Sequence, residues 1–237
     1  ASVTHVNNML ANMADAVVTS VIQDAKLLTG SNPQATIEVM PNGVIIHPRD
    51  KSAKSIPHIL FVGNLTLSDN HQAIDDFCNI TIPLISQLYG SSFQVDIVGK
   101  GPSETILALK KYPHVRLWPN TDDLSPFYRN ATLAICPMKF GVGTRIKILE
   151  AMSYFTPVVS TSQGIQGLKV KDQHNILVAD SPLQFAQQCV KLMSNDNFNI
   201  TIAENGHYLV KQNYCNYKIQ RQLAELIDRL AMHHQEN

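Results

Sequence analysis

The stretch that decides the fold is Gly141-Val142-Gly143-Thr144-Arg145-Ile146-Lys147-Ile148-Leu149-Glu150-Ala151-Met152, and Thr156-Pro157-Val158-Val159-Ser160-Thr161 follows it closely. A glycine loop without bulky side chains opens a helix here. The free N–H groups of a helix start, aided by the helix dipole, form an anion site. Arg145 and Lys147 add cations in the first turn, where the dipole alone favours acids, so a bound phosphate would account for them.

Glu150 lies among apolar residues of the same predicted helix, where an unpaired carboxylate would be costly to bury. It therefore needs a partner, and the sequence leaves two open: Lys147, three residues before it, or the hydroxyls of a ligand. A carboxylate can accept two hydroxyls at once, which suits a diol. For Arg145 and Lys147 themselves, the open alternative is a surface cation with a solvated head.

From Ile56 onward, short apolar runs alternate with helical stretches, which is typical of a parallel sheet wrapped by helices. The runs predicted as strands, which mostly lack polar alternation, are 59–62, 94–98, 115–118, 133–136, 158–160 and 176–178. The stretches predicted as helices are 70–89, 103–111, 124–129, 144–155, 181–193, 197–213 and 217–234. The predicted fold class is α/β, a Rossmann-like three-layer α/β/α arrangement with a mainly parallel six-stranded sheet. Pro83 should kink the first of these helices or end it early.

The two ends of the chain differ from this middle part. The first 50 residues predict a helix through Asn12, a strand at 16–20, a helix at 23–28 and a strand at 36–40. The last helix carries apolar residues at spacings of three and four, which predicts a stripe that covers a core: Ile219, Leu223, Leu226, Ile227 and Leu230.

Composition excludes several classes of function. The 237 residues are 44% hydrophobic and 16% charged, with a formal net charge of zero, which argues against a nucleic-acid binder and against a surface that depends on anionic lipid. No apolar run approaches the ~20 residues of a membrane span and no signal peptide is evident, so a cytoplasmic protein is expected. The four cysteines are far apart and are expected to be reduced, and no metal-ligand spacing is present, so no metal is expected.

Five motifs occur in a fixed order along the chain. They are Gly63 at a strand end, Val98-Gly99-Lys100-Gly101-Pro102, Asp123-Leu124 before Pro126-Phe127-Tyr128-Arg129, the Gly141 loop through Glu150, and Ser160-Thr161-Ser162-Gln163-Gly164-Ile165-Gln166-Gly167-Leu168. Each motif alone is common in loops, but the ordered set is specific. It resembles the donor-binding half of the retaining, nucleotide-sugar-dependent group 1 glycosyltransferases of the GT-B fold, over roughly residues 56 to 232.

This resemblance implies a domain organisation. Residues 1–50 are expected to be a remnant of the N-terminal acceptor domain with its linker, and residues 51–237 the nucleotide-sugar-binding domain with C-terminal helices. A complete enzyme of this kind carries a further Rossmann-like domain upstream. The chain is therefore expected to be a fragment, or to have its acceptor half supplied elsewhere, and to be inactive alone. Membrane contact through the missing domain stays open.

The resemblance also implies a site. Ligands of open α/β sheets bind beyond the carboxyl ends of the strands, where the loops converge. The expected donor-binding residues are Gly63, Asn64, Gly99, Lys100, Gly101, Pro119, Asn120, Gly141, Val142, Gly143, Thr144 and Glu150. The loop after Trp118 would hold the nucleobase, the Gly141–Arg145 loop the sugar diphosphate, and Glu150 the ribose hydroxyls. Arg145 and Lys147 would be catalytic, stabilising charge on the departing diphosphate, with no metal or other cofactor.

The leading expectation is transfer of a sugar, with retention, from a UDP- or GDP-sugar to a glycan, lipid or protein acceptor. Two departures from the family pattern keep an alternative open. Many members have an acid at the position of Val142 and an arginine at that of Asn64. A non-catalytic nucleotide-sugar-binding module that scaffolds or regulates a partner transferase would lose such contacts first. An epimerase or phosphorylase is disfavoured, since no lysine motif for a pyridoxal cofactor is evident.

Two further alternatives concern single positions near the predicted site. Gly99 and Gly101 could serve only to allow a tight strand-to-helix turn, without any ligand approaching them. Trp118, the sole tryptophan, is expected in the core at a strand end rather than as a stacking platform.

Overall fold

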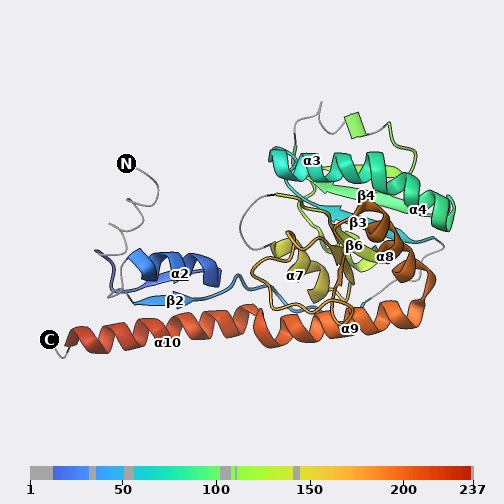
Figure 1. Cartoon of the computed structure of the whole chain (residues 1–237). Helices are drawn as coiled ribbons and strands as arrows, with labels where there is room; N and C mark the ends of the chain where they lie inside the picture. The colour runs from blue at the N-terminus through green and yellow to red at the C-terminus, as the bar shows by residue number, and fades with distance from the viewer. Residues whose placement is uncertain are drawn as a thin grey trace. The chain divides into compact units, whose positions relative to one another are not determined.

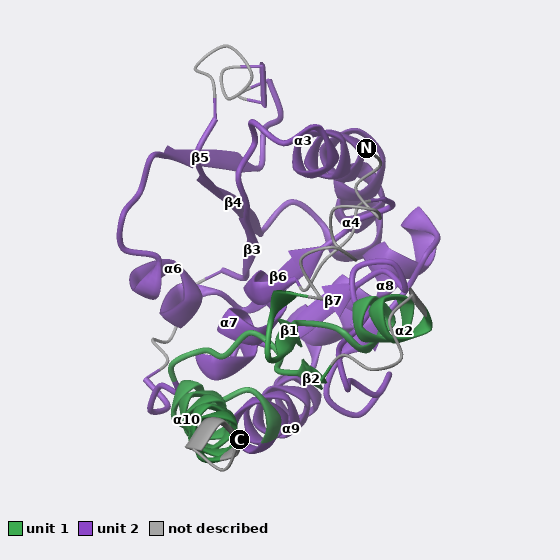
Figure 2. Cartoon of the chain, turned by 90° about the vertical axis from the view of Figure 1, so that its left-hand side faces the viewer, with its two compact units in different colours: residues 1–45, 213–237 green, residues 46–212 purple. Residues whose placement is uncertain are grey.

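The computed structural model describes residues 13–31, 36–50, 56–101, 108–109, 111–140 and 145–235. The chain divides into two compact units, one of residues 1–45 and 213–237 and one of residues 46–212 (Figure 2). The larger unit contains the sheet and the helices that pack on it. The predicted helix through Asn12 and most of the one at 103–111 lie outside the described residues.

The larger unit is built on a six-stranded sheet with strand order β5-β4-β3-β6-β7-β8 (Figure 1). Every neighbouring pair in it is parallel. The strands are β3 (His58–Val62), β4 (Gln94–Gly99), β5 (Val115–Pro119), β6 (Leu133–Cys136), β7 (Val158–Ser160) and β8 (Leu177–Val178). All six strands predicted for the region after Ile56 are present within one residue of their predicted ends, so the predicted Rossmann-like fold class is confirmed.

Helices cover both faces of this sheet because successive strand residues point to opposite faces and both sets are apolar. Ile59, Phe61 and Val95 belong to a core with buried side chains of the helices on one face. Those helices are α3 (Ser68–Asp76), α4 (Ile82–Tyr89) and α8 (Pro182–Ser194), with the π-helical turn η1 (Phe77–Thr81) between the first two. On the other face, Leu60 lies beside side chains of α6 (Ser125–Asn130) and α7 (Ile146–Ser153). Helix α9 (Asp196–Asn213) follows α8.

Pro83 neither ends nor interrupts the first long helix, contrary to one of the two expected outcomes. The helix runs on through η1 and α4 to Tyr89. Proline lacks the N–H that would bond to the carbonyl four residues earlier. The chain accommodates this with a π-helical turn just before it, in which the Ile82 N–H donates to the Phe77 carbonyl.

The smaller unit contains a βαβ element and the last helix. Strands β1 (Val17–Thr19) and β2 (Ile37–Val39) pair in parallel, and α2 (Ile22–Ser31) joins them. Helix α10 (Asn216–Gln235) carries Arg229, whose Nη2 lies 2.8 Å from Oε1 of Glu38 on β2.

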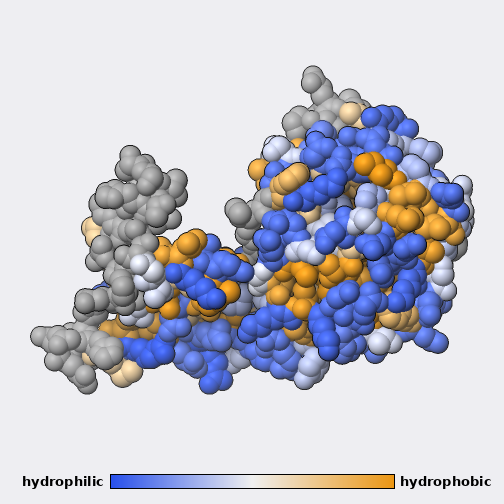
Figure 3. All heavy atoms as spheres, viewed as in Figure 1, coloured by the Kyte–Doolittle hydropathy of each residue, from blue (hydrophilic) through white to orange (hydrophobic). Residues whose placement is uncertain are grey.

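The apolar stripe of α10 is covered only in part, so the prediction of a core-covering stripe is wrong for some of its residues. Leu226 is buried, but Leu223 and Ile227 are 42% and 56% exposed. Hydrophobic residues therefore remain at the surface of this unit (Figure 3).

Candidate functional site

All six strands are parallel, so their carboxyl ends lie along one edge, and two glycines meet there. The Gly63 N–H donates to the Val98 carbonyl at 3.0 Å. A Cβ on Gly99, whose φ is +154°, would lie 1.7 Å from the Gly63 carbonyl oxygen, so no other residue fits. The glycines therefore have a packing role at the ends of β3 and β4, whether or not a ligand also approaches them.

Lys147 projects from the first turn of α7 into the same region. Its Nζ donates to Oδ1 of Asn70 at 2.9 Å and lies 4.5 Å from the centroid of the Phe61 ring. A Cβ on Gly63 would lie 3.0 Å from this Nζ, so the absent side chain leaves room for the ammonium group. Burial, and after it the charge of Arg145, lowers the pKa of Lys147.

Asn70 of α3 connects this lysine to the loop after β3. Its Nδ2 donates to the Asn64 carbonyl at 3.0 Å. The side chain of Asn64 is used within its own loop, since its Oδ1 accepts the N–H and the hydroxyl of Thr66 at 3.0 and 2.7 Å. Asn64 therefore shapes the loop and adds no positive charge to the site.

Arg145 precedes α7 and has unused donors. Its Nη2 donates to the Phe140 carbonyl at 2.9 Å, while its Nε is buried and has no hydrogen-bond partner among the described residues. None of the ion pairs in the described part of the chain includes Arg145 or Lys147. Nearby Cys136 supplies no counter-charge, because burial raises the pKa of its thiol and keeps it neutral at pH 7.

Glu150, one helical turn after Lys147, receives a partner that the sequence did not suggest. Its Oε2 accepts the Tyr128 hydroxyl of α6 at 2.9 Å. Burial, followed by the charge of Glu150, raises the pKa of Tyr128 well above 10, so the hydroxyl stays protonated and donates. The expected alternative of a Lys147–Glu150 ion pair is not formed, because Lys147 turns to Asn70 instead.

A stack of three rings supports this tyrosine. Tyr128 stacks on Tyr154 with ring centroids 5.3 Å apart, and Tyr154 stacks on His47 at 3.7 Å. The Tyr154 hydroxyl lies 2.8 Å from Oγ of Ser125, at the start of α6. The carboxylate of Glu150 therefore has a rigid support on α6 and at the end of α7.

The turn after β5 forms the outer end of the same edge. Pro119 pairs with Gly99, and the Asn120 N–H donates to the Gly99 carbonyl at 3.0 Å. Asn120 has a φ of +53°, a left-handed conformation that asparagine tolerates better than most residues. Both residues are exposed, so their backbone groups can meet a ligand.

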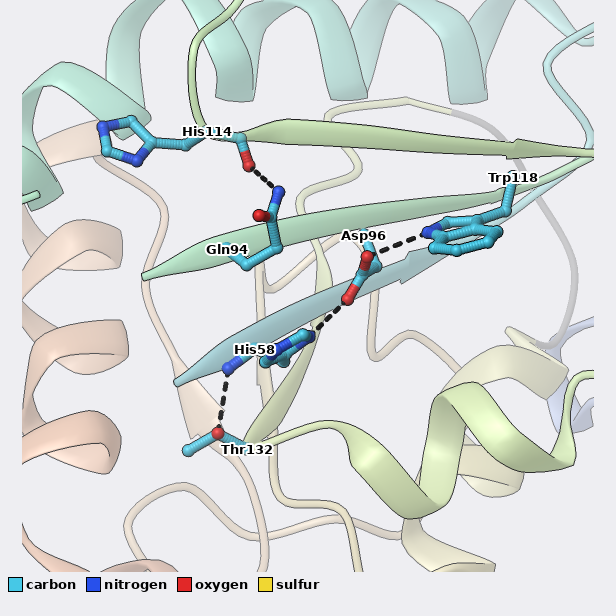
Figure 4. A network of polar contacts seen from close by, with 6 residues as sticks. All are labelled: His58, Gln94, Asp96, His114, Trp118 and Thr132. Atoms are coloured by element: carbon cyan, nitrogen blue, oxygen red, sulfur yellow. Dashed lines mark hydrogen bonds and ion pairs between the residues drawn. The ribbon is translucent and has the colours of Figure 1, made fainter. Parts of the chain in front are cut away.

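Trp118, just before this turn, is 41% exposed, so the expectation of a core position is wrong. The cause is the strand order, which makes β5 an edge strand covered from fewer sides. A buried carboxyl holds the indole, since Nε1 of Trp118 donates to Oδ1 of Asp96 at 2.9 Å and Nδ1 of His58 lies 2.6 Å from Oδ2 (Figure 4).

The described residues contain neither a candidate metal site nor a candidate membrane span. No group of three or more His, Cys, Asp and Glu residues is placed to hold a metal ion there. Within the same ranges, no helix has the length and apolar character to cross a membrane.

The model of the family described as "Glycosyl transferases group 1" matches residues 56–195, which is more than half of the chain. The chain belongs to this family. The region that matches the glycosyl transferases group 1 family runs from β3 to α8, so it includes every candidate residue at the edge of the sheet.

One curated relative also matches, the "Uncharacterized 44.6 kDa protein in cps region" of Klebsiella pneumoniae. It is 26% identical over 185 residues, which are 74% of this chain and 47% of the relative. The chain thus spans about half the length of the curated relative it matches.

Solved structures share the fold at low sequence identity. Sucrose-phosphate synthase from Thermosynechococcus elongatus matches 97% of this chain and 61% of its own, with a TM-score of 0.78 and 17% identity. TarM of S. aureus matches over 94% of this chain and 45% of the TarM chain, with a TM-score of 0.76 and 16% identity. HepE of Anabaena, in complex with UDP and glucose, matches over 95% of this chain and 66% of the HepE chain, with a TM-score of 0.72 and 19% identity.

In this member of the glycosyl transferases group 1 family, the structure brings six of the predicted residues to one edge. Gly63, Asn64 and Lys147 lie close together, Gly99 contacts Gly63, and the Pro119–Asn120 turn is bonded to Gly99. The loop residues predicted to hold the diphosphate lie outside the described residues: Gly141, Val142, Gly143 and Thr144.

Sequence reasoning missed the residues that orient this site. Asn70 and Asp96 were never singled out, and Tyr128 was noted only as part of a motif. A buried polar residue inside an apolar strand, such as Asp96 in Gln94–Gly99, is the signal that could have found one of them. Asn70 offered no such signal, because its role depends on a lysine that is 77 residues away in sequence.

Proposed function

We propose that this edge binds the diphosphate of a UDP- or GDP-sugar. The two phosphates would contact Arg145, Lys147 and the loop of Gly141, Val142, Gly143 and Thr144. The nucleobase would lie against the backbone of the Pro119–Asn120 turn, beyond the Gly99-Lys100-Gly101 segment. The ribose hydroxyls would donate to Glu150, which keeps Oε1 for them while Oε2 accepts from Tyr128.

One observation carries this proposal, the partly buried ammonium of Lys147 beside a neutral amide. Removing an ammonium from water costs several kcal/mol unless a partner offsets it, and a carboxylate is the usual partner. Among the described residues, the Lys147 ammonium has one hydrogen-bond partner, the Asn70 amide, and it lies over the Phe61 ring. The charge of Glu150 acts on it without forming an ion pair, and burial still leaves the pKa of Lys147 lowered. An anionic ligand would supply the missing charge.

The comparisons support the choice of a nucleotide sugar. The HepE structure contains UDP and glucose, the TarM variant structure contains UDP, and the pneumococcal O-GlcNAc transferase GtfA structure contains UDP and GlcNAc. A shared fold at below 20% identity does not show that this chain binds the same ligands. The proposal that it binds a nucleotide sugar therefore rests on Arg145, Lys147 and Glu150.

The chemistry we propose is glycosyl transfer with retention, as expected for this branch of the family. A nucleoside diphosphate leaves as a polyanion, and preorganised cations lower the barrier by stabilising the charge that develops on it. Arg145 and Lys147 would fill this role without a metal ion. The reaction should therefore persist in EDTA, and a requirement for a divalent cation would contradict this assignment.

We further propose that the acceptor, a glycan, lipid or protein, is held by a domain outside this chain. The solved structures cited here extend well beyond the region that this chain matches. Residues 1–50 would then belong with that acceptor domain, and the isolated chain would bind donor without transferring it. Such an assembly would work in the cytoplasm in glycan synthesis, with any membrane contact made by the acceptor half.

A second candidate is a non-catalytic module that binds a nucleotide sugar and regulates a partner transferase. It is favoured by the inward use of the Asn64 side chain, which leaves one usual phosphate contact unfilled. Glu150→Gln separates the two, because a transferase assembled with its acceptor half should lose activity whereas a scaffold should keep its effect on the partner.

Thermal denaturation with UDP, GDP, ADP and their sugars tests the donor site. A ligand at about 100 times its dissociation constant adds about 2.7 kcal/mol of stability. We expect a shift with one nucleotide that Arg145→Glu abolishes, because the new carboxylate repels the phosphates. Arg221→Ala, which removes an exposed cation of α10, is the matched control and should keep the shift. Equal shifts for Arg145→Glu and the wild type would overturn the proposal.

A further inference from the structure

A carboxyl group lies buried in the middle of β4, on the face where Gln94 and Val98 are also buried. Asp96 is 8% exposed, and on the neighbouring strands Leu60 lies opposite it on β3 and Arg116 on β5. A buried carboxylate is costly, so its position in a central strand calls for a compensating role.

Both oxygens of Asp96 are used to connect three strands (Figure 4). Oδ2 lies 2.6 Å from Nδ1 of His58 at the start of β3, and Oδ1 accepts the indole N–H of Trp118 at the end of β5 at 2.9 Å. The backbone N–H of His58 donates in turn to Oγ1 of Thr132, just before β6, at 3.0 Å. The carboxyl therefore fixes an edge strand to the two strands inside it.

The indole is also held by α6. Phe127 packs edge-to-face on Trp118 with ring centroids 5.2 Å apart, and the next residue, Tyr128, donates to Glu150. One short helix thus contacts both the tryptophan before the Pro119–Asn120 turn and the carboxylate proposed for the ribose.

We infer that Asp96 and Trp118 are positioning residues for the nucleobase: the buried carboxyl fixes the indole, and the indole fixes the backbone of the turn at Pro119, Asn120 and Thr121. The Trp118 carbonyl accepts the Thr121 hydroxyl at 3.2 Å, so the same residue shapes the turn from within. This inference rests on the proposed nucleotide site and names the part of the protein that orients its base end.

A purely structural role of the Asp96–Trp118 network would give a different experimental result. If the network only stabilised the sheet, its loss would lower the stability of the free protein and weaken all ligands alike. If it positions the turn, its loss weakens ligands that carry a base and spares those that carry only phosphates. UDP and inorganic pyrophosphate are therefore the two probes.

Trp118→Phe is the first variant, since it keeps an aromatic ring against Phe127 while it removes the donor N–H along with the second ring of the indole. Calorimetric titration of the full chain should show UDP affinity reduced about tenfold, the factor that 1.4 kcal/mol gives, with pyrophosphate affinity within about twofold of wild type. Asp96→Asn is the matched control, because its carbonyl oxygen can still accept from the indole, and UDP affinity should stay within about threefold.

Asp96→Leu removes the same hydrogen bond from the other side, since it eliminates the acceptor and keeps the tryptophan. An apolar residue suits this buried position. It should show the same selective loss of UDP affinity. Trp118 is the sole tryptophan, so its emission reports on this residue alone, and UDP should change it more than pyrophosphate does.

Unchanged UDP affinity in Trp118→Phe and Asp96→Leu would overturn the inference. So would a parallel loss of UDP and pyrophosphate affinity, which is the result of a structural role. If the wild-type chain binds neither probe, the proposed function itself fails and this inference fails with it, an outcome that the wild-type titration reveals before any variant is compared.

Discussion

Two lysines that follow β6 in sequence reach α3 and meet different partners there. Lys139, after β6, forms an exposed ion pair with Asp76 at 2.7 Å. Lys147, in α7, is partly buried and contacts the neutral amide of Asn70 at 2.9 Å. The first lysine is neutralised within the protein, at a site where solvent would have tolerated its charge. The second forms no ion pair within the described residues, in a place where partial burial makes its charge costly.

This difference indicates where the chain is prepared for an anion. Exposed ion pairs contribute little to stability, and the Lys139–Asp76 pair leaves no net charge to recruit a ligand. The region around Lys147 adds Arg145, a buried Nε without a partner among the described residues, and a neutral thiol at Cys136. Stability is given up there, and such a cost is common at functional sites.

The largest expected effect is that of Lys147→Met. A thioether chain fits the buried path of the lysine, so the free protein should be at least as stable as the wild type. Nucleotide affinity should fall roughly 10²–10³-fold, by analogy with the loss of one charge-stabilising group. Thermal denaturation and titration with UDP measure the two quantities. Lys139→Met is the control and should bind UDP like the wild type, and a similar loss in both variants would remove the distinction.

The next effect concerns the support of Glu150. Tyr128→Phe removes the hydroxyl that donates to Oε2 and leaves the ring stack with Tyr154 in place. Because the carboxylate then has no fixed orientation, UDP affinity should fall about tenfold, in line with one hydrogen bond to a charged group. Pyrophosphate affinity, which needs no ribose contact, should not change. Equal affinities for UDP before and after the substitution would show that the tyrosine only packs.

A third prediction uses the pKa of Lys147, which burial lowers from the ordinary 10.5. The charged form binds the phosphates, so affinity is present at neutral pH and is lost as pH rises through the lowered pKa. The decline should therefore begin below pH 10.5. Titrations with UDP from pH 7 upward measure it, and Lys147→Met should show a flatter profile. A decline of the same shape in that variant would assign the effect to another group.

The smallest effect is on stability at acidic pH. Burial lowers the pKa of His47 and of His207, so the folded protein binds fewer protons than the unfolded chain below about pH 6.5. Stability should therefore fall as pH decreases from 6.5 toward the lowered values. His47→Phe keeps a ring on Tyr154 and should weaken this dependence, with a change in Tm of no more than about 2–4 °C. A variant profile identical to the wild type would exclude His47 as a source.

Much of the fold could be predicted because its signal is local. The apolar runs that became β3 and β6 lack polar alternation, and this alone predicts strands covered on both faces. The order of the strands depends on contacts between residues far apart in sequence. Trp118 is exposed because that order places β5 at the edge of the sheet, whereas an interior position would have buried it.

The sequence predicts which loops and which charged residues form the candidate site, but it does not predict the partners of those residues. Arg145, Lys147 and Glu150 stand in one short stretch whose charges point to an anion site. Their actual neighbours come from other elements: Asn70 from α3 and Tyr128 from α6. A single sequence carries no signal for such pairs, since each residue taken alone has an ordinary place on a helix.

The most direct test of the central claim is to give Lys147 the kind of partner that Lys139 has. Asn70→Asp places a carboxylate beside the ammonium, and Asn70→Ala is the control that loses the same amide without adding charge. We would titrate both with UDP. The account predicts that Asn70→Asp loses affinity roughly 100-fold while Asn70→Ala stays within about fivefold of the wild type. Equal affinity of the two variants for UDP would contradict the claim that the unpaired charge of Lys147 binds the nucleotide.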